Sequence, residues 1–185
     1  FLLKDSGRGM SMKDNEIVEC FKLGGSVRKE RVRHDLGRFG CGLKTASLSQ
    51  ARCLIVVSKA KGFELIARAL DLDWMTEHNR GWQLREVDHT GITDCLDWFE
   101  TRESGTVIKW LNWDKSINDE TQFYNAIDKV NNYVSVCFHR YMTNHKIKIS
   151  CGLINLKPIS PIPSESTRKE GPIKEMTIQG SATME

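Results

Sequence analysis

The segment from Gly24 to Gly42, GGSVRKERVRHDLGRFGCG, constrains the fold more than any other stretch of this chain. It is rich in glycine and basic residues and poor in apolar periodicity, so it predicts a loop. A loop of this length inside a compact domain is uncommon and needs a reason. Two interpretations stay open at this stage: a loop with a binding function and a disordered connector.

Apolar spacing on both sides of this loop predicts helices and strands of one layered α/β domain. Residues 13–23 and 119–142 carry apolar side chains at helical spacing, and Asp119 with Gln122 resembles a capping box at the start of the second helix. The runs RCLIVVSKA, GFELIARALDL and SGTVIKWLNW predict strands, while ITDCLDWFE is ambiguous.

Composition excludes little, so partners must be inferred from motifs. The chain has 185 residues, of which 39% are hydrophobic and 28% charged, and a formal charge of +3 is too small to indicate nucleic acid by itself. The six cysteines lack metal-ligand spacing, so we expect reduced, buried thiols and no metal site. Because no apolar run has the length of a membrane span, we expect a cytoplasmic protein, or a nuclear one in a eukaryote.

The ends of the chain suggest a piece of a longer protein, since it opens on FLLKDSG without an initiator Met. All four prolines fall after the last predicted strand of the domain. We therefore expect one domain over residues 1–157, and a linker with the start of a following domain over residues 158–185.

The motif Asp5-Ser6-Gly7-Arg8-Gly9-Met10 joins an acceptor-only carboxylate to two closely spaced glycines. The glycines allow a ligand to approach the main chain, and the carboxylate accepts a hydrogen bond from an exocyclic amine such as that of adenine. A tight surface turn is the alternative reading of the same residues.

A second motif, GRFGCGLKT, spans Gly37 to Thr45 and places glycines before a helix start. Free backbone amides and the helix dipole make such a start an anion site. A dinucleotide fingerprint requires a strand immediately before the glycines, and here a basic loop precedes them. Leu43 breaks the pattern of a phosphate-binding loop. A helix-start loop without a ligand stays the alternative.

The two motifs, followed by LIVVSK and SGTVIKW, resemble in order and spacing the GHKL ATPases, a superfamily of gyrase B, heat-shock chaperone, histidine kinase and MutL ATPase domains. The form GRFGCGLKTASLS is most similar to MORC-type and related chaperone-like proteins. The resemblance implies an α+β two-layer sandwich, with a mixed, mostly antiparallel sheet covered on one face by helices, a long ATP lid and an incomplete N-terminus.

The resemblance also implies a binding site for ATP and Mg²⁺. Asp5 would receive the adenine amino group, the segment from Gly24 to Gly42 would form the lid, and Thr106 would join the network around adenine. The implied binding residues are Asp5, Gly7, Gly9, Met10, Gly25, Ser26, Gly37, Arg38, Phe39, Gly40, Cys41, Gly42, Leu43, Lys44, Thr45 and Thr106.

The family's general-base Glu and Mg²⁺-binding Asn lie on a helix before the first motif, and no residue of this chain takes their place, Asn15 and Glu16 included. We expect ATP hydrolysis by the intact protein, with lid closure gating a homodimer, and an inactive fragment here. Two alternatives stay open: a non-hydrolysing, nucleotide-gated module that binds DNA or a protein client, and a histidine kinase ATP-binding domain.

Overall fold

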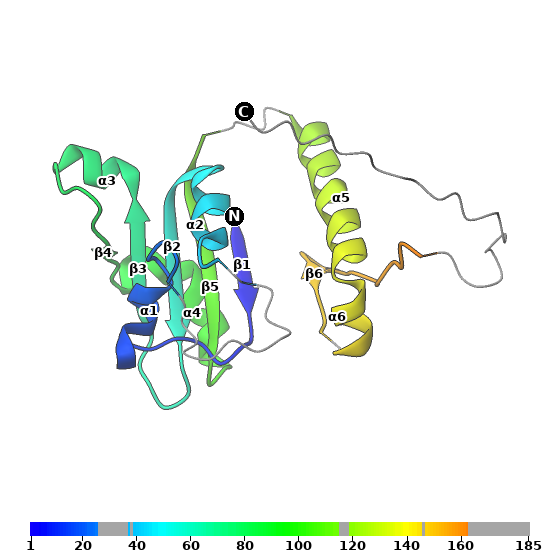
Figure 1. Ribbon diagram of the computed structural model, residues 1–185, viewed down its shortest axis with the longest axis horizontal. Coiled ribbons are helices and arrows are strands. Elements are labelled where there is room, and N and C mark those ends of the chain that lie inside the picture. Colours follow the sequence, from blue (N-terminus) through cyan, green and yellow to red (C-terminus); the bar gives the residue numbers. More distant parts are fainter. Residues whose placement is uncertain (26–36, 38, 115–118, 146, 163–185) are drawn as a thin grey trace, which may run out of the picture. The chain divides into compact units, whose positions relative to one another are not determined.

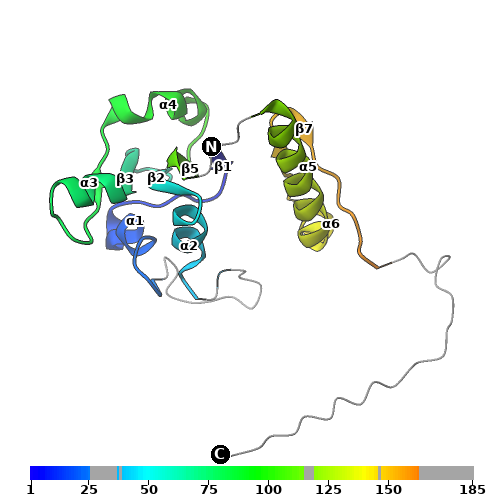
Figure 2. The ribbon, with the colours of Figure 1, turned by 90° about the horizontal axis from the view of Figure 1, so that it is seen from above.

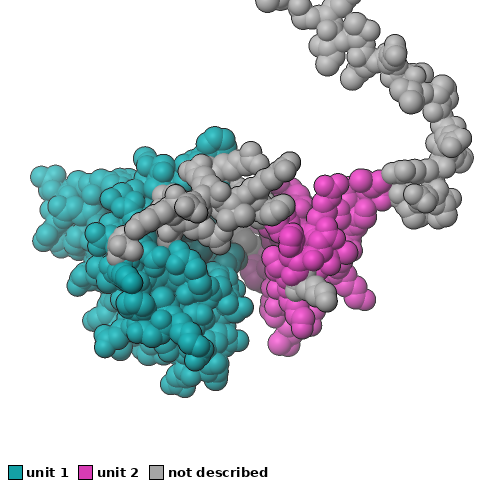
Figure 3. Space-filling view, turned by 60° about the horizontal axis from the view of Figure 1, so that its bottom comes forward, with its two compact units in different colours: residues 1–116 teal, residues 117–185 magenta. Residues whose placement is uncertain are grey.

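The computed structural model describes residues 1–25, 37, 39–114, 119–145 and 147–162. By its internal contacts the chain divides into two units, Phe1–Ser116 and Ile117–Glu185, which Figure 3 colours separately. The predicted boundary after residue 157 falls inside the second unit. The assignment of residues 1–157 to one ATP-binding domain stays a prediction.

The first unit is built on a single five-stranded sheet (Figure 1). Its elements in chain order are β1 (Leu2–Asp5), η1 (Lys13–Asn15), α1 (Glu16–Glu19), α2 (Gly42–Leu48), β2 (Ala51–Lys59), β3 (Ile66–Asp71), α3 (Leu72–Glu77), β4 (Arg85–Glu86), η2 (His89–Ile92), α4 (Thr93–Glu100) and β5 (Gly105–Trp113). The strand order is β1-β5-β2-β3-β4, and each neighbouring pair is antiparallel. The predicted α/β fold with a mostly antiparallel sheet is confirmed.

Alternating side chains of β2 divide the hydrophobic core between the two faces of the sheet. Leu54 and Val56 point to the face that carries α1, where they pack with Ile17 and Phe21. Residues of α2 and α3 complete this cluster. The unbroken apolar run of β2 follows from this arrangement, because a strand buried on both faces has no polar side to alternate with.

Helix α4 packs against the other face of the sheet, where Cys95 and Phe99 meet Ile55 and Val57 of β2. Figure 2 shows α4 on the side of the sheet opposite to α1 and α2. The ambiguous segment ITDCLDWFE is therefore a helix. The family resemblance implied helices on one face of the sheet, and the structure places α4 on the other face as well.

The helix predicted over residues 13–23 is shorter and interrupted. Asn15 has a left-handed backbone with φ of 55°, and it separates η1 from α1. A left-handed residue cannot continue a right-handed helix. The chain then leaves α1 through a series of turns that reach Gly25, whose amide donates to the Lys22 carbonyl.

The second unit holds the longest described helix. Its elements are α5 (Glu120–Cys137), α6 (His139–Asn144), β6 (Ser150–Cys151) and β7 (Ile154–Asn155), and the two strands form a hairpin. The Asp119 side chain accepts a hydrogen bond of 2.7 Å from the Gln122 amide, which confirms the predicted cap. The helix predicted to reach residue 142 breaks at Phe138. Packing of its apolar stripe on a sheet stays a prediction.

Among the helices of the described residues, none combines the length and the apolar character needed to cross a membrane.

Candidate functional site

Three polar side chains on adjacent strands form a row across the sheet. Asp5 at the end of β1 lies opposite Thr106 of β5, and Thr106 lies opposite Ser58 of β2. Residues paired in this way project from the same face, so all three share the face of Val56, which carries α1. Ser58 is 0% exposed and Thr106 8% exposed, whereas Asp5 is exposed. The row therefore leads from the interior to the surface.

Asp5 is oriented by the backbone of the loop that follows it. The Gly7 amide donates a hydrogen bond of 2.7 Å to Oδ1 of Asp5. A Cβ on Gly7 would stand 2.6 Å from the same oxygen, so a larger residue there would displace the Asp5 carboxylate. Within the described part of the chain, Oδ2 of Asp5 has no recorded hydrogen-bond partner, which leaves it available to a donor on a ligand.

The loop then passes close to the end of β2. Gly9 has φ of 68°, and a Cβ there would stand 1.9 Å from the carbonyl oxygen of Lys59. The next amide, that of Met10, donates 2.8 Å to the hydroxyl of Ser58. The Ser104 hydroxyl donates to the Gly7 carbonyl oxygen at 2.9 Å. The loop is thus held by Ser58 of β2 and by Ser104, the residue before β5.

Glu16, at the start of α1, fixes the middle of this loop. Its carboxylate accepts a hydrogen bond of 2.7 Å from the Arg8 guanidinium and one of 3.0 Å from the Ser11 amide. Partial burial raises the pKa of Glu16, but the hydrogen bonds from Arg8 and Ser11 together outweigh it, so the pKa is lowered. The Glu16 carboxylate therefore holds the loop through Arg8 and Ser11, and its exclusion as a general base stays a prediction.

The second glycine motif is anchored at the other end of α1. Gly40 has φ of 63°, and a Cβ there would stand 2.2 Å from the carbonyl oxygen of Gly25. A Cβ on Gly25 would in turn stand 2.3 Å from the Glu19 carbonyl oxygen. The two ends of the predicted lid therefore meet at backbone contact distance. By contrast, Gly37 faces open space and Phe39 is 80% exposed.

Helix α2 begins at Gly42, after Cys41, as the motif predicted. Its first-turn amides have no partner within the helix, which is the usual basis of an anion site. Thr45 turns its hydroxyl back to the Cys41 carbonyl oxygen at 3.1 Å. Lys44 is only 3% exposed, and its ammonium donates a hydrogen bond of 2.8 Å to the carbonyl oxygen of Cys20. Burial lowers the pKa of Lys44.

The short helix α1 thus supports both motifs. Its beginning holds the Asp5 loop through Glu16, and its end meets the second motif through the Cys20 carbonyl and Gly25. Leu43 contributes to the core on the same face. Two predicted binding residues, Ser26 and Arg38, lie outside the described residues, and their roles stay predictions.

Sequence reasoning missed Ser58, the fully buried member of the row. Its hydroxyl lies within hydrogen-bond distance of Met10, Gly105 and Thr106. The signal was a single hydroxyl at the end of the apolar run LIVVS, where a buried polar side chain needs partners.

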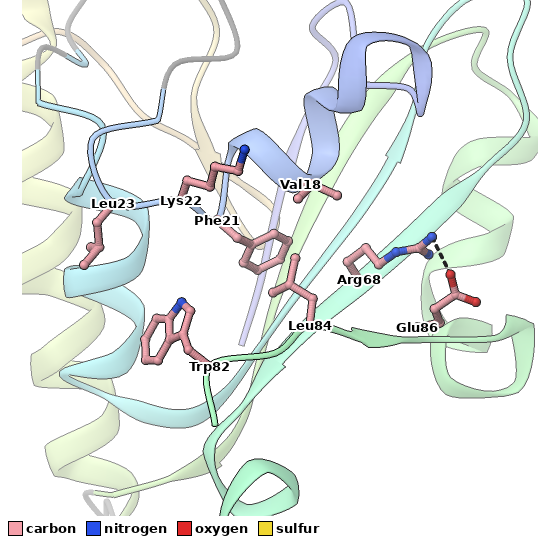
Figure 4. Close-up of a pocket in the computed structure, with 8 residues that line it drawn as sticks. All are labelled: Val18, Phe21, Lys22, Leu23, Arg68, Trp82, Leu84 and Glu86. Atoms are coloured by element: carbon pink, nitrogen blue, oxygen red, sulfur yellow. Dashed lines mark ion pairs between the residues drawn. The ribbon is translucent and has the colours of Figure 1, made fainter. Parts of the chain in front are cut away.

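A separate hollow lies between α1 and the β3–β4 edge, with a volume of about 620 Å³ (Figure 4). Phe21 and Leu84 lie in the middle of the hollow, with Leu23 and Trp82 on one side and the ion pair of Arg68 with Glu86 on the other. Its lining residues are Val18, Phe21, Lys22, Leu23, Arg68, Trp82, Leu84 and Glu86. None of them belongs to the row, so this hollow is distinct from the predicted base site.

Comparison with known proteins bears on the family of the chain, and the binding roles of the row residues stay predictions. A search of curated proteins gave no match. A family model described as "Histidine kinase-, DNA gyrase B-, and HSP90-like ATPase" matches residues 1–106. The match covers both glycine motifs and ends at Thr106, so it contains every member of the row. The closer resemblance to MORC-type proteins stays a prediction. The chain belongs to the histidine kinase-, DNA gyrase B- and HSP90-like ATPase family.

Proposed function

We propose that this chain binds ATP, with the adenine amino group at Asp5 and the rest of the base beside Thr106. Family membership supports an ATP-binding, ATPase-type function. The residue assignment rests on the hydrogen bonding of the Asp5 carboxylate. Its Oδ1 accepts from the Gly7 amide, and its Oδ2, on an exposed side chain, can accept from a ligand. A carboxylate fixed in this way accepts a hydrogen bond from an amino group and repels a carbonyl oxygen, which has no proton to donate.

The second motif would hold the phosphates. Amides of the first turn of α2 supply donors, and the buried Lys44 ammonium, which donates to the Cys20 carbonyl oxygen, adds positive charge to the same turn. Contact between Gly25 and Gly40 gives the predicted lid a closed base. Such a base would leave α1 and α2 in place during the lid closure that we propose.

The described residues do not by themselves fit a Mg²⁺ ion. They contain no group of three or more His, Cys, Asp or Glu side chains that could hold a metal. In this proposal, Mg²⁺ would bind together with the triphosphate of ATP.

Hydrolysis and its use are proposed for the intact protein. There, ATP-driven lid closure would gate a homodimer in the manner of chaperone-like members, on a DNA or protein client. For this chain alone we expect binding with little turnover, because Glu16, a carboxylate close to the motif, is engaged by Arg8 and Ser11. That engagement favours a non-hydrolysing, nucleotide-gated binding module as the second candidate function.

Calorimetric titration of the chain with ATP, ADP and GTP tests the binding proposal. We expect ATP and ADP to bind, and GTP to bind at least about tenfold more weakly because its base presents a carbonyl where adenine has an amine. Equal affinity for GTP would contradict the role of Asp5. Single-turnover hydrolysis by the intact protein separates the candidates, since bound but uncleaved ATP would leave only the binding module.

A further inference from the structure

The hydroxyl of Ser58 joins the two halves of the row. It accepts a hydrogen bond of 2.8 Å from the Met10 amide, in the loop that follows Asp5. It also lies 3.0 Å from the Gly105 carbonyl oxygen and 3.0 Å from the hydroxyl of Thr106, both on β5. Since Ser58 is 0% exposed, water does not substitute for these partners.

The protons of this cluster can be counted. A serine hydroxyl has one donor and two acceptor lone pairs, and the Met10 amide occupies one lone pair. The single Ser58 proton goes to Gly105 or to Thr106, because both oxygens accept. If it goes to Gly105, Thr106 donates its own proton to Ser58 and offers a ligand only lone pairs. If it goes to Thr106, the Thr106 proton is free for a ligand.

We infer that Ser58 is a positioning residue that sets whether Thr106 donates or accepts toward a purine base beside Asp5. Adenine presents an amino donor and, next to it, ring nitrogens that accept. Asp5 accepts from the amino group, so the second contact requires a donor. In the structure the Ser58 hydroxyl donates to the Gly105 carbonyl oxygen. When adenine binds, this proton turns to Thr106, and the Thr106 proton is then free for the base. This inference rests on the proposed function.

Ser58 also fixes where Thr106 and the loop stand relative to each other. The same oxygen that polarises Thr106 holds the Met10 amide, one residue after Gly9. Loss of the hydroxyl therefore releases the loop and the Thr106 proton together. A residue that served only to fill space would affect neither the loop amide nor the Thr106 contact.

A double-mutant cycle on the full chain tests this. ATP affinity is measured by calorimetry for the wild type, Ser58→Ala, Thr106→Val and the double variant. We expect each single change to weaken binding about tenfold, as loss of one or two hydrogen bonds implies. In the Thr106→Val background, Ser58→Ala should weaken binding by no more than about threefold, because the relay is already broken.

Additive effects would overturn the inference, since a purely structural serine acts independently of Thr106. Ser58→Thr keeps the oxygen and should restore ATP affinity to within about threefold of the wild type, whereas unrestored affinity would count against the relay. Should Ser58→Ala fail to fold, the near-isosteric Ser58→Cys, with its weak donor, takes its place.

Hydrogen exchange at the Met10 amide gives a readout without nucleotide. Exchange at this amide should be faster in Ser58→Ala and unchanged in Thr106→Val, and equal protection in all three proteins would overturn the loop contact. If the wild type binds no ATP, the proposed function fails and the inference with it. If the wild type binds ATP but the cycle is additive, only the inference fails.

Discussion

Gly9 lies directly against the backbone of Lys59: a Cβ on Gly9 would stand 1.9 Å from the Lys59 carbonyl oxygen. The loop that carries the predicted base site is therefore shaped to the end of β2, and it cannot move outward without losing the Met10 contact to Ser58. Packing against β2 therefore explains the glycine at position 9 without a ligand.

Gly9→Ala should destabilise the protein and abolish ATP binding. The left-handed backbone alone costs about 1–2 kcal/mol for a residue with a side chain, and the clash with Lys59 adds to it. Thermal unfolding and calorimetry measure both effects. Gly62→Ala is the matched control, because Gly62 also has positive φ (80°) but faces open space. An equal loss of stability in the two variants would show that the contact with Lys59 is relaxed in solution.

Asp5→Asn should weaken ATP binding by about tenfold or more while leaving the fold intact. An amide still accepts from Gly7, but it forfeits a charge-assisted hydrogen bond to the adenine amine. Asp88→Asn is the control, since the Asp88 carboxylate also accepts from a glycine amide, that of Gly91, and lies outside the row. Unchanged ATP affinity in Asp5→Asn would refute the adenine assignment.

Gly40→Ala and Gly37→Ala should differ, although the sequence treats the two glycines alike. Gly40 has φ of 63° and touches Gly25, so a side chain there would open the base of the predicted lid, whereas Gly37 has room for one. We expect nucleotide affinity to fall about tenfold or more in the first variant and to stay within about threefold in the second. Comparable affinities for both would show that contact between Gly25 and Gly40 does not matter for binding.

Alkaline pH should destabilise the first unit through Cys53 and Cys95, which are buried, and through the partly buried Cys20. Burial raises the pKa of Cys20 and Cys53 from 9.0 to about 12, and that of Cys95 to about 11. The unfolded chain ionises first, so this contribution to stability is complete below pH 9 and is lost as pH rises toward 11 or 12. Each thiol adds a slope of about 1.4 kcal/mol per pH unit at most.

Urea unfolding under reducing conditions, from pH 8 upward, measures this slope. Replacing Cys95 by Ala should reduce the slope, because one ionising thiol is removed from both states. Val57→Ala, in the same core cluster, should lower stability without changing the slope, since it removes no titrating group. A slope that does not change in Cys95→Ala would contradict the burial of this thiol.

Local signals in the sequence were sufficient for much of the fold. The run around Val56 identified β2, and Asp119 marked the beginning of α5, because each element is specified by adjacent residues. The residues of the row on β1 and β5, Asp5 and Thr106, were identified through motifs whose order matches a known family. The break at Asn15 was missed because a single left-handed residue leaves no periodic signal.

The sequence by itself determined the main strands and the longest helix, and which residue types are available for a nucleotide. Only the tertiary structure decided that Asp5, Thr106 and Ser58 share one row, that α1 supports both glycine motifs, and that Lys44 turns toward Cys20. These relations depend on strand register and on helix packing, which join residues far apart in the chain. Ser58 shows the difference: its three partners lie in two distant segments, so no local pattern announces them.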